Sequence, residues 1–333
     1  MDVLTISDLE VHFSTANGVV KAVNGVDFSI GSGEIMALVG ESGSGKSITG
    51  LSILGLVPKP NGKVVNGRIL FNGEDLVGKT EKHYRKIRGQ EIAMIFQNPL
   101  SAMDPSFTVG NQLLEIIRDR QGLSRVAALN EAKKLLDLVG IHDHNRVLNA
   151  YPHALSGGMR QRAMIAMALS CKPKLLIADE PTTALDATIQ KQILSLLKKI
   201  NQELNTSILF ITHDFGVVAN LCDRVGVMYA GRILEYGKTE EILKRPKHPY
   251  TKGLMDAMPE TSLEAFLSTK GSSKKFRLKQ ITGSPPDLLD LPSGCHFYER
   301  CERATSQCLQ AFPEVKQDKD HLVRCFHEEE IYV

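Results

Sequence analysis

Residues 35–56 read IMALVGESGSGKSITGLSILGL. The apolar run Ile35–Val39 indicates a buried strand, Gly40–Ser47 a glycine-rich loop, and Ser47–Leu56 carries the apolar spacing of a helix. Glycines allow successive backbone N–H groups to turn toward phosphate oxygens, and the start of the helix adds the positive end of its dipole. The loop matches the pattern GxxxxGK[ST]. The stretch therefore predicts an α/β fold with a phosphate-binding loop.

Each residue of this loop has an expected part in holding a nucleotide. Lys46 would place its charge on the outer phosphates, and the Ser47 hydroxyl would bind Mg²⁺. The other loop residues expected to contact the nucleotide are Gly40, Glu41, Ser42, Gly43, Ser44, Gly45 and Ile48.

A second apolar run, residues 174–179, reads as a buried strand that ends in two carboxylates. Asp179 is placed to hold Mg²⁺ through water. Glu180 would point in another direction and polarise the attacking water as a general base. The alternative for Glu180 is an acid that only caps a helix. His213 follows a further apolar run, 207–211, at the carboxyl end of a strand, where open α/β sheets bind ligands.

Between the loop and the carboxylates stands Leu155-Ser156-Gly157-Gly158-Met159. A serine and two glycines before the helical run Met159–Ser170 make a second anion site at a helix N-terminus. One chain does not need two such sites for a single nucleotide. With this insertion the chain resembles the nucleotide-binding subunits of the ABC ATPase family.

The resemblance implies a head-to-tail dimer in which each chain completes the nucleotide site of the other. In that arrangement Ser156, Gly157 and Gly158 would contact the partner's ATP. Asp186, in Ala184-Leu185-Asp186, matches the D-loop at the same interface. Closure of the pair on two ATP molecules would perform mechanical work, and hydrolysis would reopen it.

The resemblance also assigns roles to three residues outside these motifs. Gln97 resembles the glutamine that touches Mg²⁺ or the water and links the nucleotide state to a helical subdomain. His213 matches the switch histidine at the γ-phosphate. Phe13 matches the aromatic residue on which adenine stacks, with core packing as the alternative. The residues expected to carry catalysis are Glu180, His213, Gln97 and Lys46.

The apolar pattern along the chain predicts the architecture. Residues 4–39 read as β-structure with turns at Asn17-Gly18 and Gly31-Ser32-Gly33. Buried strands are expected at 91–96, 174–179, 207–211 and 225–230, and helical patterns separate most of them, so we expect a largely parallel sheet covered by helices. From Gln97 to Met159 the pattern is helical only. The resemblance implies a RecA-like core with an N-terminal antiparallel β subdomain and an inserted helical subdomain.

We expect an ABC ATPase domain at 1–245, with the helical subdomain at about 97–160, and a C-terminal extension at 246–333. Gly271-Ser272-Ser273-Lys274-Lys275 reads as a linker. Three stretches resemble the oligopeptide and dipeptide importer ATPases. They are residues 151–186, His248-Pro249-Tyr250-Thr251, and Gly283–Leu289 followed by Gly294-Cys295.

Four of the six cysteines, Cys295, Cys301, Cys308 and Cys325, fall in the last 40 residues, a cluster that favours metal over disulfides in a cytosolic chain. Their spacing is not the paired C-x₂-C of a zinc ribbon. In the family resembled, such cysteines are associated with a [4Fe–4S] cluster, which takes four thiolates. Family members often carry proline after the first two cysteines, where His296 and Glu302 stand here. A zinc site with His296, His321 or His327, and free thiols, are the alternatives.

The composition excludes several classes of function. Forty basic and 38 acidic residues give a net charge of +2, so nothing favours nucleic acid as a ligand. No run of about 18 apolar residues predicts a membrane span, and Met1–Thr5 does not begin a secretory signal. These observations predict a cytosolic protein, and the resemblance implies a peripheral location at the cytoplasmic face of the inner (plasma) membrane.

The resemblance as a whole implies an ATP-hydrolysing subunit that energises import of oligopeptides or dipeptides. The implied partners are a second, related but non-identical ATPase subunit, two membrane permease subunits and an extracytoplasmic peptide-binding protein. The alternatives are an importer ATPase for antimicrobial peptides, glutathione or nickel, and a soluble ABC mechanoenzyme. A mechanoenzyme would carry a long coiled coil or two tandem ATPase units, and this chain has neither.

Overall fold

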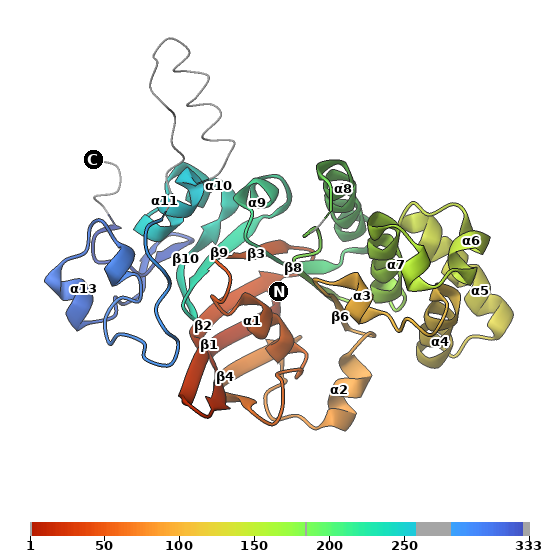
Figure 1. The fold of residues 1–333 in the computed structure, drawn as a ribbon, viewed down its shortest axis with the longest axis horizontal. Helices are drawn as coiled ribbons and strands as arrows, with labels where there is room; N and C mark the ends of the chain where they lie inside the picture. Colours follow the sequence, from red (N-terminus) through yellow and green to blue (C-terminus); the bar gives the residue numbers. More distant parts are fainter. Residues whose placement is uncertain (1, 184, 258–280, 329–333) are drawn as a thin grey trace, which may run out of the picture. The chain divides into compact units, whose positions relative to one another are not determined.

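The computed structural model describes residues 2–183, 185–257 and 281–328 (Figure 1). The expected linker at 271–275 and Ala184 lie outside these residues. The chain forms two compact units whose segments alternate along the sequence. The first comprises Met1–Val3, Ile30–Ile35 and Gly78–Ile211, and the second comprises Leu4–Ser29, Met36–Val77 and Thr212–Val333. The domain limits expected at 245 and at 97–160 stay predictions.

Three parallel strands form the sheet of the first unit. They are β6 (Ile92–Ile95), β7 (Leu175–Asp179) and β8 (Ser207–Thr212), in the order β8-β7-β6. In register, Ile92 pairs with Leu175, and Leu175 pairs with Ser207. Every residue of these strands is buried, which is why each reads as a continuous apolar run. The strands predicted from those runs are confirmed.

The rest of this unit is helical. Its elements are α2 (Glu81–Ile87), α3 (Pro99–Ala102), α4 (Val109–Gln121), α5 (Arg125–Leu138), α6 (His144–Asn149), η1 (Pro152–Ala154), α7 (Gly157–Leu169) and α8 (Ala187–Leu204). Helices α4 to α7 lie together (Figure 1). Leu113, Ile117, Ala132 and Leu136 are fully buried among them. The helical region predicted between Gln97 and Met159 is confirmed.

The second unit begins with an antiparallel sheet in the order β2-β1-β4-β5. Its strands are β1 (Asp2–Thr15), β2 (Gly18–Gly31), β4 (Gly62–Phe71) and β5 (Glu74–Asp75). Strands β1 and β4 pair from Leu4 opposite Phe71 to Phe13 opposite Gly62. Alternate apolar residues, including Leu4, Ile6 and Ile69, form the buried face. The expected N-terminal β-structure is confirmed, whereas β4 and β5 were not predicted.

The second unit also holds a mixed set of strands in the order β11-β12-β10-β9-β3. They are β3 (Ile35–Val39), β9 (Arg224–Tyr229), β10 (Arg232–Lys238), β11 (Lys316–Asp318) and β12 (His321–Val323). Strands β3 and β9 pair in parallel, whereas the other pairs of this set are antiparallel. The turn Ala230-Gly231 has positive φ at both residues, and this geometry reverses the chain into an antiparallel hairpin. Strands β10, β11 and β12 therefore form an antiparallel edge that was not predicted, whereas the strand predicted at 225–230 is confirmed as β9 and pairs in parallel with β3.

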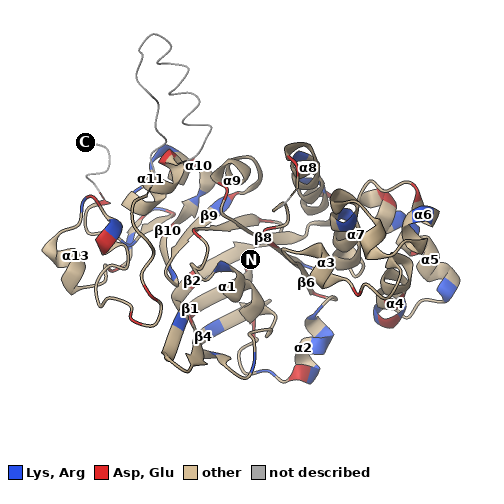
Figure 2. Ribbon diagram, viewed as in Figure 1, with Lys and Arg blue, Asp and Glu red and all other residues tan. Residues whose placement is uncertain are grey.

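Short helices complete the second unit: α1 (Lys46–Ile53), α9 (Phe215–Leu221), α10 (Thr239–Lys244), α11 (Pro249–Asp256), η2 (Tyr298–Arg300) and α13 (Ser306–Gln310). Acidic and basic residues are interspersed over the elements of both units (Figure 2). None of the helices in the described ranges is long and apolar enough to cross a membrane.

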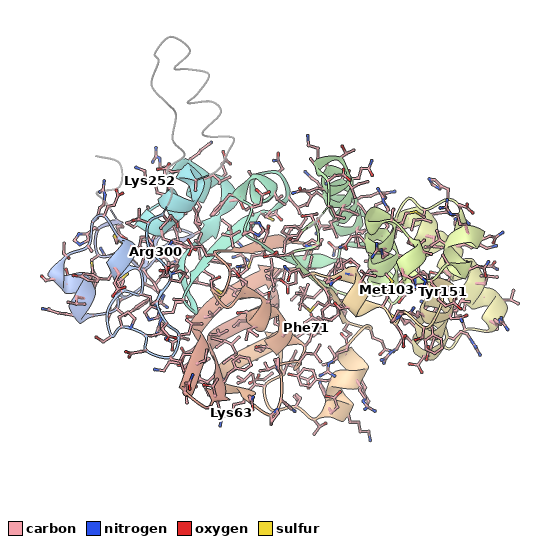
Figure 3. The ribbon with its side chains drawn as sticks, viewed as in Figure 1. Lys63, Phe71, Met103, Tyr151, Lys252 and Arg300 are labelled. Carbon is pink, nitrogen blue, oxygen red and sulfur yellow. The ribbon has the colours of Figure 1, made fainter. Side chains whose placement is uncertain are left out.

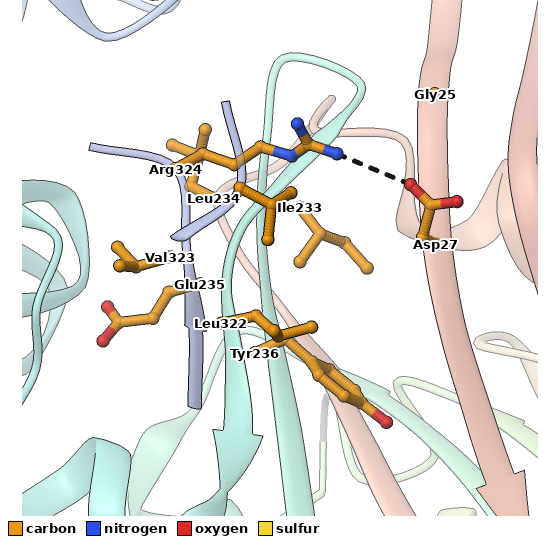
Figure 4. A pocket seen from close by; sticks show the side chains of 10 residues that line it. Gly25, Asp27, Ile233, Leu234, Glu235, Tyr236, Leu322, Val323 and Arg324 are labelled. Atoms are coloured by element: carbon orange, nitrogen blue, oxygen red, sulfur yellow. Dashed lines mark ion pairs between the residues drawn. The ribbon is translucent and has the colours of Figure 1, made fainter. Parts of the chain in front are cut away.

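The C-terminal tail, here residues 246–257 and 281–328, packs on the strands of its own unit. The buried carboxylate of Glu235 in β10 accepts hydrogen bonds from the backbone N–H groups of Lys247 (2.6 Å) and His248 (3.1 Å), and it pairs with His321 Nε2 (2.6 Å). Nearby, Arg324 pairs with Asp27 at 3.5 Å beside a pocket of about 140 Å³ (Figure 4). The tail is thus tied to both sheets of the second unit.

Candidate nucleotide site

The phosphate loop lies in the second unit, between β3 and α1. Gly45 is the N-cap of α1 with φ of 104° and has no side chain to cap this helix start. A Cβ at Gly45 would lie 2.4 Å from the Ala22 carbonyl oxygen, and one at Gly40 would lie 2.0 Å from that of Met228. The backbone at Ala22 and Met228 therefore lies too close to Gly45 and Gly40 for either position to carry a side chain. Backbone N–H groups at this helix start suit an anion.

Lys46 turns back over this loop. Its side chain is buried, and Nζ donates to the carbonyl oxygens of Gly40 and Glu41, both at 2.8 Å, and to Ser44 Oγ at 3.3 Å. The ammonium is therefore held at the loop itself, where a phosphate would meet it. A buried cation beside a glycine-rich loop is suited to bind a polyanion.

The carboxylates lie in the first unit, at the end of β7. Asp179 is buried and closes the strand, and Glu180 follows with φ of 44°. A non-glycine residue in this left-handed region costs of order 1–3 kcal/mol and is concentrated at functional sites. The N–H of Glu180 donates to the Ile211 carbonyl at 2.9 Å, which fixes this conformation.

Glu180 and Gln97 meet, although 83 positions separate them. Gln97 Nε2 donates to Glu180 Oε2 at 3.0 Å, and Thr183 Oγ1 donates to the same oxygen at 2.9 Å. The cap of α8 is Asp186, whose carboxylate accepts from the N–H groups of Thr188 and Ile189. The alternative in which Glu180 caps that helix is therefore not what the structure shows.

The serine–glycine motif forms the start of α7, as its sequence predicts. Ser156 is the N-cap, and its Oγ accepts from the Met159 N–H at 3.4 Å. Ser156 and Gly157 are exposed. A Cβ on Gly158 would lie 2.9 Å from Ile189 Cγ2, so the second glycine allows α7 to approach α8. This leaves an exposed start of a 13-residue helix.

The two remaining site residues lie in the second unit. His213 directly follows β8 and is exposed. Phe13 is half-buried near the end of β1, opposite Gly62, where a Cβ would lie 2.5 Å from the Phe13 ring. Packing against β4 therefore accounts for part of the Phe13 surface. Its adenine-stacking role and the role of His213 stay predictions.

The predicted site residues fall into two groups. The first unit holds Gln97, Ser156, Gly157, Gly158, Asp179, Glu180 and Asp186, and the second holds Phe13, the loop Gly40–Ile48 and His213. The functional roles of both groups stay predictions. The assembly of both groups around one nucleotide is a prediction from the family.

The tail cysteines come together. Cys295, Cys301, Cys308 and Cys325 line one pocket, together with apolar residues that include Phe297, Pro313 and Phe326. All four are free thiols. Burial, with the neighbouring cysteines adding to it, raises the pKa of Cys295 to about 12 and that of Cys325 to about 11. Across residues 2–183, 185–257 and 281–328, no group of three or more His, Cys, Asp or Glu is arranged to hold a metal ion.

The histidines of the tail do not support the zinc alternative. His321 pairs with Glu235, and His296 Nδ1 lies 3.1 Å from the Ala230 carbonyl oxygen while its ring packs against Phe312. Neither lines the cysteine pocket. His327 does line it, and its Nε2 lies 3.0 Å from Thr305 Oγ1. Of the three histidines named for the zinc alternative, only His327 therefore lies at the cysteines.

Sequence reasoning missed that the tail reaches the phosphate loop. The Arg300 guanidinium pairs with the Glu41 carboxylate, and the Tyr250 hydroxyl accepts from the Glu41 N–H at 2.9 Å. One signal was available: Glu41 is an acidic residue inside a loop that binds anions, so its charge needs a cationic partner.

Two regions of this chain match known protein families. Residues 23–183 match the family described as ABC transporter, and residues 234–308 match the oligopeptide/dipeptide transporter, C-terminal region. The chain is 50% identical over 301 residues to the oligopeptide transport ATP-binding protein OppD of Bacillus subtilis (strain 168), covering 90% of this chain and 82% of that protein. It is 47% identical over 325 residues to the dipeptide transport ATP-binding protein DppD of the same organism, covering 97% and 94%.

Among solved structures, a dimeric ATP-binding cassette in a post-hydrolysis state, bound to ADP and Pi, matches with a TM-score of 0.64 and 27% identity. The match covers 71% of this chain and 98% of that chain.

The fold and the motifs define the ABC class of ATPases. Within that class, the chain belongs to the ATP-binding proteins of oligopeptide and dipeptide ABC transporters. The predicted family and fold class are confirmed.

Proposed function

We propose that this chain binds and hydrolyses ATP to drive the import of peptides through a membrane transporter. The observation that carries the hydrolytic part is Glu180, whose backbone is held in the left-handed region while Gln97 and Thr183 orient its carboxylate. A carboxylate oriented in this way can accept a proton from an attacking water. The match over residues 234–308 and the named peptide transport relatives support a peptide cargo over nickel.

Each site residue has a part in this chemistry. Lys46 and the loop N–H groups would bind the outer phosphates. Ser47, Asp179 and Gln97 would hold Mg²⁺, which neutralises phosphate charge when bound. His213 would contact the γ-phosphate, and Glu180 would take the proton of the water. Positioning and electrostatic stabilisation then supply most of the rate.

Hydrolysis in this proposal needs a second ATPase subunit. Ser156, Gly157 and Gly158 would contact the nucleotide held by the partner's loop, because the exposed start of α7 is a ready anion site. The solved cassette that matches this chain is described as dimeric. We propose a related, non-identical chain as the partner.

The transporter would supply the remaining partners. Exposed apolar side chains on the first unit, including Leu100, Phe107 and Tyr151, suit docking onto two membrane permease subunits. Of these three, Tyr151 is labelled in Figure 3. The chain would then lie at the cytoplasmic face of the membrane. An extracytoplasmic peptide-binding protein would deliver the cargo.

Changing Glu180→Gln tests the hydrolytic assignment. We expect the ATPase rate of the assembled transporter to fall at least about 100-fold, while ATP still binds, because the amide keeps the size of the side chain and loses the base. Thr183→Ala removes only one orienting hydrogen bond and should cost far less. A near-normal rate for the Glu180→Gln variant would refute the role of Glu180.

We also propose that the four tail cysteines hold a [4Fe–4S] cluster. The support is that the four thiols line one apolar pocket and match the ligand count of such a cluster. Binding would deprotonate thiols whose pKa burial now raises. Anaerobically purified protein should absorb near 400 nm and contain about four irons and four sulfides per chain, and Cys308→Ser should lose both. Stoichiometric zinc without iron would exclude the cluster.

A further inference from the structure

An ion pair joins the tail to the phosphate loop. Arg300 Nη1 lies 2.7 Å from Glu41 Oε2, and Nη2 lies 2.9 Å from Oε1. The Arg300 side chain is 5% exposed and that of Glu41 is 26% exposed. Two parallel N–H···O bonds to one carboxylate form the strongest geometry of an arginine pair, and burial limits its screening by salt. The contact is therefore more than a solvated surface pair.

The tail also binds the backbone of Glu41. The hydroxyl of Tyr250, a fully buried residue, accepts a hydrogen bond from the Glu41 N–H at 2.9 Å. The Glu41 carbonyl oxygen meanwhile accepts from Lys46 Nζ at 2.8 Å. All the polar groups of Glu41 are thus engaged, two by residues beyond 245 and one by the loop lysine.

Arg300 itself is fixed by its surroundings. Its Nε donates to the Thr282 carbonyl at 3.0 Å, Nη1 lies 3.3 Å from the Tyr229 hydroxyl, and the guanidinium stacks near the rings of Tyr229 and Phe297. Phe297 also packs against Tyr250 with ring centroids 5.3 Å apart. The labelled Arg300 can be followed in Figure 3. A side chain with this many partners has little freedom to move away from Glu41.

This anchoring has a consequence for the loop. A glycine-rich backbone has many accessible conformations, and ordering it on binding costs conformational entropy. A loop held beforehand avoids part of that cost and binds its ligand more tightly. Among the described residues, Arg300 and Tyr250 contact Glu41 from outside the loop and so anchor it.

We infer that Arg300 is a positioning residue for the phosphate loop: with Tyr250 it holds Glu41 so that the loop is ordered for the phosphates of ATP, and the C-terminal tail thereby sets ATP affinity. The inference rests on the proposed binding of ATP by this loop. Arg300 is adjacent to Cys301, so the cysteine pocket and the loop anchor belong to one segment of the tail.

Equilibrium binding of a fluorescent ATP analogue to the full chain tests this inference, with the melting temperature measured on the same samples. Arg300→Gln should weaken binding of the analogue about 10-fold, because the phosphate loop would no longer be held in place before the nucleotide binds. Arg300→Lys should recover only part of the affinity, because a lysine cannot form the bidentate pair. Tyr250→Phe, which keeps the buried ring, should weaken binding about 3-fold, the effect of one hydrogen bond. The Glu41→Gln/Arg300→Gln double variant should be no weaker than Arg300→Gln alone.

Arg324→Gln is the matched control, because it breaks an arginine pair between the tail and Asp27 that does not touch the loop. Its affinity for ATP should lie within about 2-fold of that of the unaltered chain, because a change that does not touch the loop should not be coupled to ATP binding. If the affinity losses of Arg300→Gln and Arg324→Gln follow their losses of melting temperature, the tail is only structural and the inference is wrong.

Lys46→Ala separates the inference from the function on which it rests. If Lys46→Ala abolishes binding and both Arg300→Gln and Tyr250→Phe bind normally, the loop is the ATP site but the tail does not set its affinity. If Lys46→Ala itself binds normally, the assignment of the loop fails. Should Arg300→Gln not fold, Tyr250→Phe and Glu41→Gln decide the question by the same measurement.

Discussion

At the residue scale, the phosphate loop and Glu180 differ in what holds them in place. The phosphate loop could be predicted from glycines and a lysine at fixed spacing, because all of its residues are consecutive. Glu180 was predicted as a base from its place after an apolar strand. Its left-handed backbone and its contact with Gln97 could not be read from the sequence, because the Ile211 carbonyl and a side chain 83 positions away impose them.

Two glycines of the loop give a prediction at this scale. Gly45→Ala should destabilise the protein by about 3 kcal/mol, because the new Cβ meets a backbone oxygen at 2.4 Å in addition to the left-handed strain. Gly43 also has positive φ, but a Cβ added there would meet no atom of the described residues within 4 Å. Gly43→Ala should therefore cost only about 1 kcal/mol. Urea unfolding measures both, and equal losses would contradict the close approach at Gly45.

At the scale of the element, length and burial decide what could be predicted. Strands β3, β6, β7, β8 and β9 were found because they are buried runs of apolar residues. Strands β11 and β12 have three residues each, β11 is exposed, and the buried His321 of β12 pairs with Glu235. Backbone pairing with the distant strand β10, where Val323 lies opposite Glu235, makes β12 a strand, and no local pattern records such a partner.

The helix starts give a prediction at this scale. Ser156 and Ser124 are both exposed N-caps with a serine Oγ 3.4 Å from a backbone nitrogen. Each change to Arg should cost about 1 kcal/mol of stability through the lost cap. Only Ser156→Arg should reduce the ATPase rate of the assembled transporter, at least about 50-fold, by blocking the partner's nucleotide.

ATP binding by the loop of the isolated chain should be unaffected by either change. Equal ATPase rates in the Ser156→Arg and Ser124→Arg variants would show that the start of α7 does not contribute to the partner's site.

At the scale of the whole molecule, the motifs of the tail were recognised in the sequence, but its contact with the phosphate loop was not predicted. Arg300 and Glu41 are 259 positions apart, so only the folded chain brings them together. The four cysteines were predicted to act together because they fall within the last 40 residues and because of the family resemblance, and in the structure they line one pocket. The two groups of candidate nucleotide-site residues could be named from the sequence because their motifs are short and continuous, and their assembly around one nucleotide stays a prediction.

Peptide uptake into sealed vesicles decides whether ATP hydrolysis by this chain drives import. The vesicles would contain the two permeases, the partner ATPase and this chain, with the binding protein and a labelled peptide outside and ATP inside. We expect ATP-dependent accumulation of the peptide with the unaltered chain. With Glu180→Gln, accumulation should be lost although ATP still binds. Undiminished uptake with the Glu180→Gln variant would contradict the claim that hydrolysis by this chain drives import.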